Sequence, residues 1–122
     1  MSERKYRPEL LNILTKTQAA EEMGKIGASG IDIMVPKSLF KVVKLHSIRN
    51  AIANIIKQEM LSIGGEATVN KGTVNCSVPE TDVLLMGTLK HHKLLIEKLK
   101  SQVGESKEIA ENLENVLKEE LE

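Results

Sequence analysis

Aromatic residues are almost absent from this chain, which has one Tyr, one Phe and no Trp among its 122 residues. The core must therefore consist of aliphatic side chains and Met, and the 41% hydrophobic content is enough for one domain of this length. Aromatic side chains also form the platforms on which single-stranded nucleic acids stack their bases. Their scarcity argues against RNA-binding folds of the stacking type, and we do not expect a nucleic acid partner.

Cysteine and long apolar runs are also scarce. The single cysteine, Cys76, allows neither an internal disulfide nor a cysteine-rich zinc site, and we expect it to be a small buried side chain in a strand. The first ten residues contain no apolar run typical of a signal peptide. The longest apolar runs are far shorter than the roughly 20 residues of a membrane helix. We therefore expect a cytoplasmic protein without a membrane segment, a metal site or a cofactor.

The net charge of zero hides an asymmetry between the body of the chain and its end. Residues 1–102 carry 15 Lys and Arg against 10 Asp and Glu, whereas residues 103–122 carry 2 against 7. The positive charges of the body are scattered, which is not typical of a nucleic-acid-binding face. This distribution indicates an acidic C-terminal helix beside a mildly basic body.

The order of periodic segments predicts an α+β fold. The expected elements are a helix from Pro8 to the glycines at 27 and 30, strands at 31–35 and 40–46, a helix at 48–63 capped by Ser47, a hairpin of EATVN and TVNCSV around Lys71-Gly72, a strand DVLLMG buried on both faces, a helix capped by Thr88, and a last helix at 105–121. This order predicts a two-layer sandwich with a mixed or antiparallel sheet of four to five strands and helices mainly on one face. We divide the chain into an α+β domain at 1–104 and an acidic amphipathic helix at 105–122.

Two polar residues fall within apolar helix faces. Projection of residues 48–63 places Glu59 in a stripe of Ile and Met side chains, and projection of residues 89–103 places His92 in a similar stripe. Such groups need hydrogen bonds or a counter-charge when they are buried. Glu59 can bond backbone N–H groups of the following loop, or it can act as an acid, a base or a ligand anchor. His92 can bond a neighbour such as Glu59, whereas its pair with His91 is a poor metal chelate because the two side chains diverge.

Glycine-containing turns supply the remaining candidates. Gly64-Gly65 follows a helix, so we interpret it as a helix stop, since phosphate loops precede a helix. Gly87-Thr88 precedes a helix at the end of a buried strand, where α/β proteins bind anions, although helix capping by Thr88 also explains it. The candidate ligand-binding residues are Glu59, Gly64, Gly65, Asp82, Gly87, Thr88 and His92, and no residue is assigned to catalysis or to metal binding.

Four segments between Asn54 and Gln102 form a long ordered string, namely KQEMLSIGGEA, NCSV, TDVLLMGT and IEKL. This string resembles the N-terminal accessory region that precedes the pterin-binding barrel in certain archaeal and anaerobic bacterial dihydropteroate synthases, and a looser match extends to Ile31. The chain is far too short for a (β/α)₈ barrel of about 250 residues. The resemblance therefore implies an accessory domain without the synthase's catalytic residues. It also marks His92 as a departure, because the relatives usually have a large apolar residue there.

We favour a non-catalytic accessory or interaction module over an enzyme. The alternative is a protein that binds or converts a pterin-like or phosphorylated small molecule through Gly87-Thr88, with Glu59 and Asp82 nearby. The expected partner is another protein or a second copy of the chain. The last helix carries an apolar stripe that must be buried against the body or against a second copy, and we lean towards a homodimer. The stripe consists of Ile109, Leu113, Val116, Leu117 and Leu121.

Overall fold

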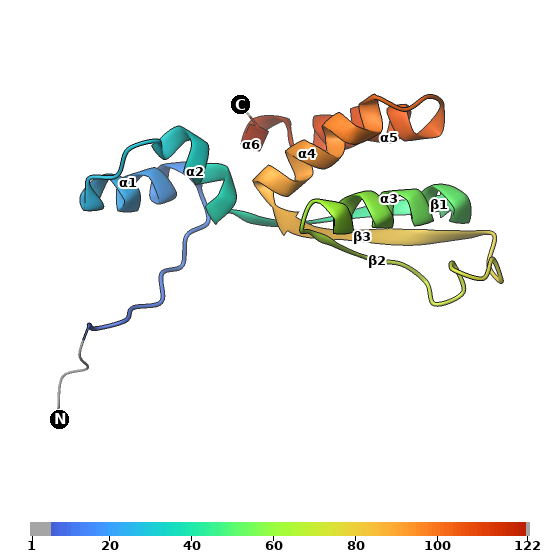
Figure 1. Cartoon of the computed structure of the whole chain (residues 1–122), viewed down its shortest axis with the longest axis horizontal. Coiled ribbons are helices and arrows are strands. Elements are labelled where there is room, and N and C mark those ends of the chain that lie inside the picture. The colour runs from blue at the N-terminus through green and yellow to red at the C-terminus, as the bar shows by residue number, and fades with distance from the viewer. Residues whose placement is uncertain (1–5, 122) are drawn as a thin grey trace.

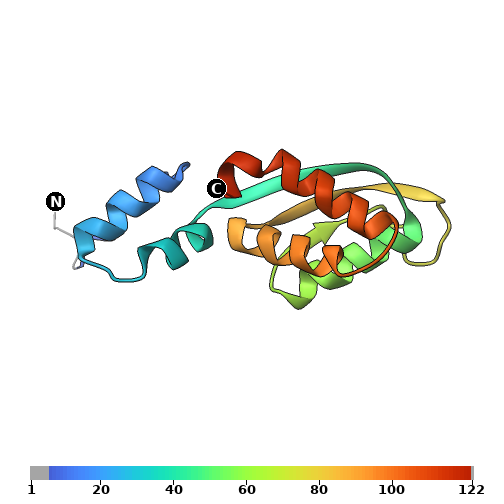
Figure 2. The same cartoon turned by 90° about the horizontal axis from the view of Figure 1, so that it is seen from above.

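The computed structural model describes residues 6–121, which form an α+β fold around a three-stranded sheet (Figure 1). In chain order the elements are α1 (Lys16–Ile26), α2 (Ile31–Ser38), β1 (Phe40–Arg49), α3 (Asn50–Ser62), β2 (Glu66–Thr68), β3 (Glu80–Thr88), α4 (Leu89–Lys100), α5 (Glu105–Val116) and α6 (Lys118–Leu121). Figures 1 and 2 show α3, α4 and α5 over one face of the sheet, with α1 and α2 beside the end where β1 begins.

The sheet contains three strands in the order β1-β3-β2, so the prediction of four to five strands is wrong. The central strand β3 pairs antiparallel with both neighbours, with Thr88 opposite Phe40 and Met86 opposite Glu66. The α+β class itself agrees with the prediction. The difference in strand number arises at two segments, because residues 31–35 lie in α2 and residues 73–78 form turns.

The segment IDIMV is helical because helical spacing packs Ile31 and Val35 against neighbouring helices, while Ile33 is 68% exposed. Val35 is buried in a small cluster with Ala19 of α1 and Leu89 of α4, and Ile31, one turn earlier, contacts the same cluster. Its β-branched residues favour an extended chain, and Pro36 lies inside the helix. Tertiary contacts therefore override local propensity at α2.

The segment between β2 and β3 turns because α3 binds its backbone. The side-chain amides of Asn50 and Asn54 donate to the carbonyl oxygens of Val78, at 2.8 Å, and Thr73, at 3.1 Å. These bonds hold the segment beside α3, where it cannot form the second strand of a hairpin with β2. Cys76, which we expected to be buried in that strand, is exposed in a turn with a φ of 59°. That prediction is wrong.

The first helix begins later than predicted, at a capping box. The Thr15 side chain accepts a hydrogen bond from the Gln18 N–H, and the Gln18 side chain accepts one from the Thr15 N–H, both at 3.1 Å. This pair satisfies two free donors and sets the helix start. Residues 8–14, expected to be helical, are instead an extended segment (Figure 1). The helix ends at Gly27, as predicted, in the left-handed conformation.

Most other boundaries follow their sequence signals. Helix α3 ends before Gly64, whose φ is 97°, Thr88 caps α4, and Gly104 precedes α5. Helix α3 begins at Asn50 and not at residue 48, because β1 continues through Ser47, the predicted cap.

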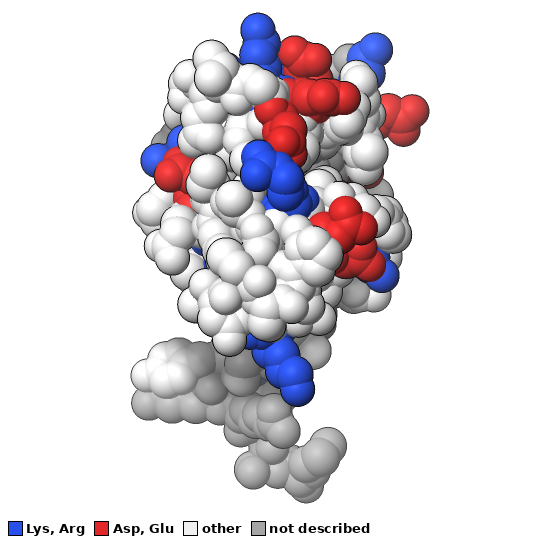
Figure 3. All heavy atoms as spheres, turned by 90° about the vertical axis from the view of Figure 1, so that its right-hand side faces the viewer, with Lys and Arg blue, Asp and Glu red and all other residues white. Residues whose placement is uncertain are grey.

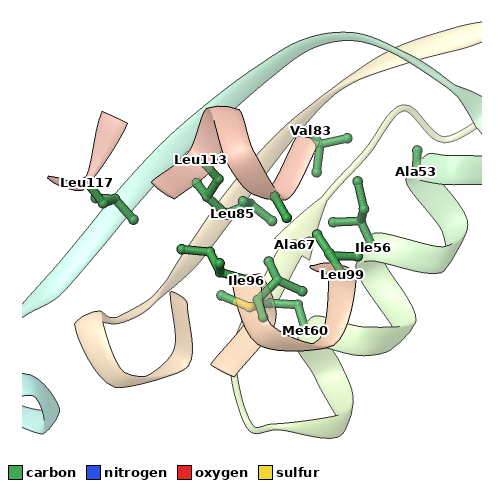
Figure 4. Packing of buried hydrophobic residues seen from close by; sticks show 12 residues of the cluster. Ala53, Ile56, Met60, Ala67, Val83, Leu85, Ile96, Leu99, Leu113 and Leu117 are labelled. Carbon is green, nitrogen blue, oxygen red and sulfur yellow. The ribbon is translucent and has the colours of Figure 1, made fainter. Parts of the chain in front are cut away.

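The core lies between the helices and the covered face of the sheet (Figure 4). Ile56 and Met60 of α3, Leu85 of β3 and Leu99 of α4 are fully buried there. As predicted from the lack of aromatic residues, the large buried side chains among the described residues are mainly aliphatic.

The C-terminal helices fold back over the body. Leu113 of α5 and Leu117 belong to the core and are 1% and 4% exposed (Figure 4). The ion pairs between this end and the body are Arg49–Glu105 at 3.0 Å, Lys41–Glu120 at 3.7 Å and Lys100–Glu114 at 2.7 Å. Most of the apolar stripe is thus covered within the chain, so it no longer points to a second copy.

Helices cover one face of the sheet but not the other. Along β3, Val83 and Leu85 are fully buried beneath the helices, whereas the alternating Leu84 and Met86 are only partly buried. Within residues 6–121, Figures 1 and 2 show no helix over this second face. The prediction that DVLLMG is buried on both faces is therefore wrong for one of them.

Candidate functional site

The uncovered side of the sheet, which we call the open face, carries side chains from all three strands. The pairing places Val42 of β1 and Glu66 of β2 on either side of Met86. By the same register and strand alternation, the open face consists of Phe40, Val42, Lys44, Glu66, Thr68, Glu80, Asp82, Leu84, Met86 and Thr88.

One end of the open face is apolar. Phe40 and Val42 are 64% and 54% exposed on β1, and the partly buried Leu84 and Met86 lie beside them on β3. Scattered apolar residues are normal on protein surfaces, whereas a contiguous apolar group makes this end of the open face a candidate contact surface. Phe40, the single Phe of the sequence, thus lies on the surface.

The other end of the open face is polar and hollowed. A groove of about 480 Å³ lies between the end of β1, β3 and the segment that follows β2. Its wall is fixed by Thr81, whose hydroxyl accepts a hydrogen bond from the Asn70 N–H at 2.9 Å. The lining residues are Lys44, Ser47, Thr68, Val69, Asn70, Glu80, Thr81, Asp82 and Leu84.

A β-bulge shapes this groove. The pairing of β1 with β3 shifts between Leu45 and Ile48, and Ser47 has a φ of 52°. The bulge directs the Ser47 N–H to Asp82 Oδ1 at 2.9 Å, while Lys44 Nζ lies 3.8 Å from Asp82 Oδ2. The hydrogen bond from Ser47, assisted by the Lys44 charge, holds the pKa of Asp82 below its ordinary value. Asp82 is therefore a stable anion in the groove.

The predicted anion site at Gly87-Thr88 is occupied by a side chain of the protein. His91 Nδ1 accepts a hydrogen bond from the Thr88 N–H at 3.0 Å, and the Thr88 hydroxyl accepts one from the His91 N–H at 3.3 Å. A Cβ on Gly87 would lie 2.9 Å from the His91 Cβ. Position 87 therefore requires a glycine because the His91 side chain packs directly against it, and Thr88 acts as a helix cap.

The predicted Gly64-Gly65 site abuts the same histidine. A Cβ on Gly64 would lie 3.4 Å from His91 Nε2, and one on Gly65 would lie 2.8 Å from the terminal carbon of Met60. The turn is therefore a helix stop that fits closely around core side chains, in line with the structural interpretation of this motif.

Glu59 and His92 have separate structural partners. Glu59 Oε2 lies 3.4 Å from Lys98 Nζ, so this carboxylate joins α3 to α4 at the molecular rim. His92 is fully buried, and its Nε2 lies 2.9 Å from the carbonyl oxygen of Lys41. Its Nδ1 has no hydrogen-bond partner among the described residues. Burial lowers the pKa of His92, although the bond to Lys41 opposes this effect.

The predicted site residues thus form no single site. Gly64, Gly65, Gly87 and Thr88 gather around His91 and Met60. Asp82 lies six residues from Thr88 along β3, about 20 Å away at the rise of a strand. Glu59 belongs to α3, which covers the face of the sheet to which Gly87 also points, but its carboxylate is paired with Lys98.

The open face and the Ser47 bulge were not predicted from the sequence. The alternation of Phe40, Val42 and Lys44 was visible, but it did not show which of the two sets of β1 side chains would be left uncovered. Leu84 and Met86 did not indicate an uncovered face either, because a continuous apolar strand is typical of a strand that is buried on both faces.

Charged side chains show no single-signed patch at the end of the molecule that carries the groove-forming segment. Figure 3 shows Lys and Arg interspersed with Asp and Glu over the helices, and few charges below them. Within residues 6–121, no group of three or more His, Cys, Asp or Glu could hold a metal ion. None of the helices formed by these residues has the length and apolar character required to cross a membrane.

Comparison of the chain with protein-family models, with curated proteins and with solved structures finds no significant match.

Proposed function

We propose that this chain is a non-catalytic cytoplasmic module that binds another protein chain through the open face of its sheet. The exposure of Phe40 and Val42 beside Leu84 and Met86 carries the proposal. An antiparallel sheet with one solvated face normally alternates apolar and polar residues, with the polar set towards water. Here the apolar set continues on the uncovered side, where its burial against a partner would stabilise a complex.

The contacts of the chemically versatile side chains support a non-catalytic role. Glu59 is paired with Lys98, His92 is bonded to the backbone of β1, and His91 is bonded to Thr88. Each of these groups holds two elements of the fold together, or caps a helix. The Thr88 hydroxyl lies 3.2 Å from His91 Nδ1, but the same hydroxyl accepts a hydrogen bond from the His91 N–H as the cap of α4.

The resemblance of residues 54–102 to the accessory region of dihydropteroate synthases is compatible with the same proposal. In those enzymes the region is attached to a large catalytic barrel, so a stand-alone relative is a candidate to bind a separate protein.

The groove beside Asp82 favours one alternative, a protein that binds a small molecule. Its volume of about 480 Å³ falls within the range of ligand sites. The carboxylates of Glu80 and Asp82 disfavour phosphorylated ligands there. Thermal unfolding in the presence of pterins, nucleotides and phosphates tests this alternative, since a specific ligand raises the melting temperature by mass action.

Affinity capture from cell extract tests the proposed module. Proteins retained by the parent chain should be lost with the Phe40→Ser/Val42→Thr variant. Val103→Ser is the matched control, because Val103 is 90% exposed and lies away from the sheet, between α4 and α5. Retention of the same proteins by parent, variant and control would contradict a role for the open face.

A further inference from the structure

The extended segment before α1 exposes several apolar side chains, although Ile13 packs against the small cluster of Val35 and Leu89. We call residues 7–14 the arm. Its leucines Leu10, Leu11 and Leu14 are 100%, 45% and 65% exposed. Figure 1 shows the arm extending below the level of the sheet, on the side of the open face, and away from the sheet. The molecule therefore has two uncovered apolar features, the arm and the open face.

The direction in which the arm leaves the body is held by the capping box of α1. The Gln18 side chain accepts hydrogen bonds from the N–H groups of Leu14, at 2.8 Å, and Thr15, at 3.1 Å. These two bonds fix the backbone at the C-terminal end of the arm, where it joins α1. From this junction the arm leads away from its own sheet (Figure 1).

The arm matches the open face in length. From Arg7 to Leu14 an extended chain spans about 23 Å, at roughly 3.3 Å per residue. On the same scale β3 spans about 26 Å from Glu80 to Thr88. One arm can therefore cover the central strand from its polar end to its apolar end.

The arm also matches the open face in chemistry. Arg7 is exposed at one end of the arm, Pro8 and the exposed Glu9 follow it, and the leucines begin at residue 10. On the open face the exposed carboxylates Glu80 and Asp82 lie at one end, and the apolar group around Val42 lies at the other. An arm laid along β3 with Arg7 at the carboxylates places its leucines on the apolar group.

We propose that the arm of one copy of this chain binds the open face of a second copy, and that two copies exchange arms about a two-fold axis. This inference rests on the proposed function, and it identifies the partner as the chain itself. Reciprocal exchange creates two identical arm-to-face contacts and closes the assembly as a dimer. The dimer does not depend on the C-terminal helix, which is covered within the chain.

Sedimentation velocity over a range of protein concentrations tests the proposal with full-length variants. The parent chain should pass from monomer to dimer as its concentration rises. The arm variant Leu10→Ser/Leu11→Ser and the face variant Phe40→Ser/Val42→Thr should each dimerise at least about tenfold more weakly, because each loses buried apolar area. All four positions are exposed, so far-ultraviolet circular dichroism should show an unchanged fold.

A mixture of the two variants separates exchange from internal closure. The face variant keeps an intact arm and the arm variant keeps an intact face, so a 1:1 mixture should regain a dimer through one arm-to-face contact.

Charge reversal adds a second test. Arg7→Glu and Glu80→Arg should each weaken dimerisation, and their combination in one chain should restore part of it.

The outcomes distinguish the two proposals. A parent chain that stays monomeric at every concentration would overturn arm exchange, and so would variant chains that dimerise as the parent does. If the face variant blocks dimerisation but the arm variant does not, the open face remains the contact surface and only the arm assignment fails. If neither variant has an effect on dimerisation or on capture from extract, both proposals fail.

Discussion

The imidazole of His92 on α4 reaches across the interior to the backbone of Lys41 on β1, with 2.9 Å between His92 Nε2 and the carbonyl oxygen. Since a carbonyl oxygen only accepts hydrogen bonds, Nε2 carries a proton, and in the neutral ring Nδ1 is then unprotonated. His92 is fully buried, and this burial lowers its pKa. A helix and a strand are therefore joined by a buried imidazole whose pKa is lowered, so that burial favours its neutral form.

This arrangement predicts that stability falls in mild acid. The folded pKa of His92 lies below the unfolded value of about 6.5, so the unfolded chain binds more protons as the pH drops. The contribution of His92 is complete above about pH 6.5 and decreases as the pH falls towards the folded pKa. Urea unfolding measured between pH 7 and pH 5 should show this decline.

The variant His92→Gln should flatten that decline, because an amide can still donate to Lys41 but does not titrate. His46→Gln is the matched control, since His46 is exposed on β1. An unchanged pH profile in His92→Gln, or a flattened one in the control, would show that the buried imidazole is not the cause.

Gly87 should tolerate no side chain. A Cβ there would lie 2.9 Å from both the His91 Cβ and the terminal carbon of Met60, so Gly87→Ala should destabilise the fold by about 1–3 kcal/mol. Gly24→Ala is the control, because no atom lies within 4 Å of a Cβ at Gly24 in α1. It should stabilise the helix by up to about 1 kcal/mol. Equal effects of the two changes in chemical denaturation would refute this account of Gly87.

Glu59 should matter little for stability. Its partner Lys98 is 42% exposed and the pair is 3.4 Å apart, so the variant Glu59→Gln should change the unfolding free energy by less than about 1 kcal/mol. The effect should shrink further at high salt, which screens such a pair. A loss of several kcal/mol would indicate a partner or a role for Glu59 beyond this ion pair.

The C-terminal helices should be required for folding. A chain ending at Val103 loses the buried Ala110, Leu113 and Leu117 and uncovers one side of α4. Each lost leucine costs about 2–5 kcal/mol, which together rivals the whole stability of a small domain. The shortened chain should lack a cooperative thermal transition. A folded, dimer-forming shortened chain would contradict the cover assigned to α5.

Local signals in the sequence predicted most of the elements, but they could not predict segments whose structure depends on contacts with distant residues. Gly27, Gly64 and Thr88 act within one turn of their own positions, so they marked element ends correctly. The failures at 31–35 and 73–78 were decided by residues far away in the sequence. Val35 is held helical by α1 and α4, and the 73–78 turns are held by amides of α3.

The candidate site was less predictable than the fold. Projection correctly placed His92 within a buried helix face, but it also placed Glu59 inside the apolar stripe, whereas the Glu59 side chain is 28% exposed, and it could not identify Lys41 and Lys98 as their partners. The exposure of Val42 depends on which side of the sheet the helices cover, and the pattern of β1 alone contains no information on that choice.

The accessibility of position 42 provides the sharpest measurement. In a Cys76→Ser background, Val42→Cys places a thiol on the open face, and Val103→Cys places one at a site that is 90% exposed in the parent. Maleimide labelling at position 42 should be fast in dilute protein and should slow as the concentration rises, while labelling at position 103 stays constant. A rate at position 42 that is the same at every concentration would contradict a self-binding open face, and one that is slow even in dilute protein would show that the chain covers this face itself.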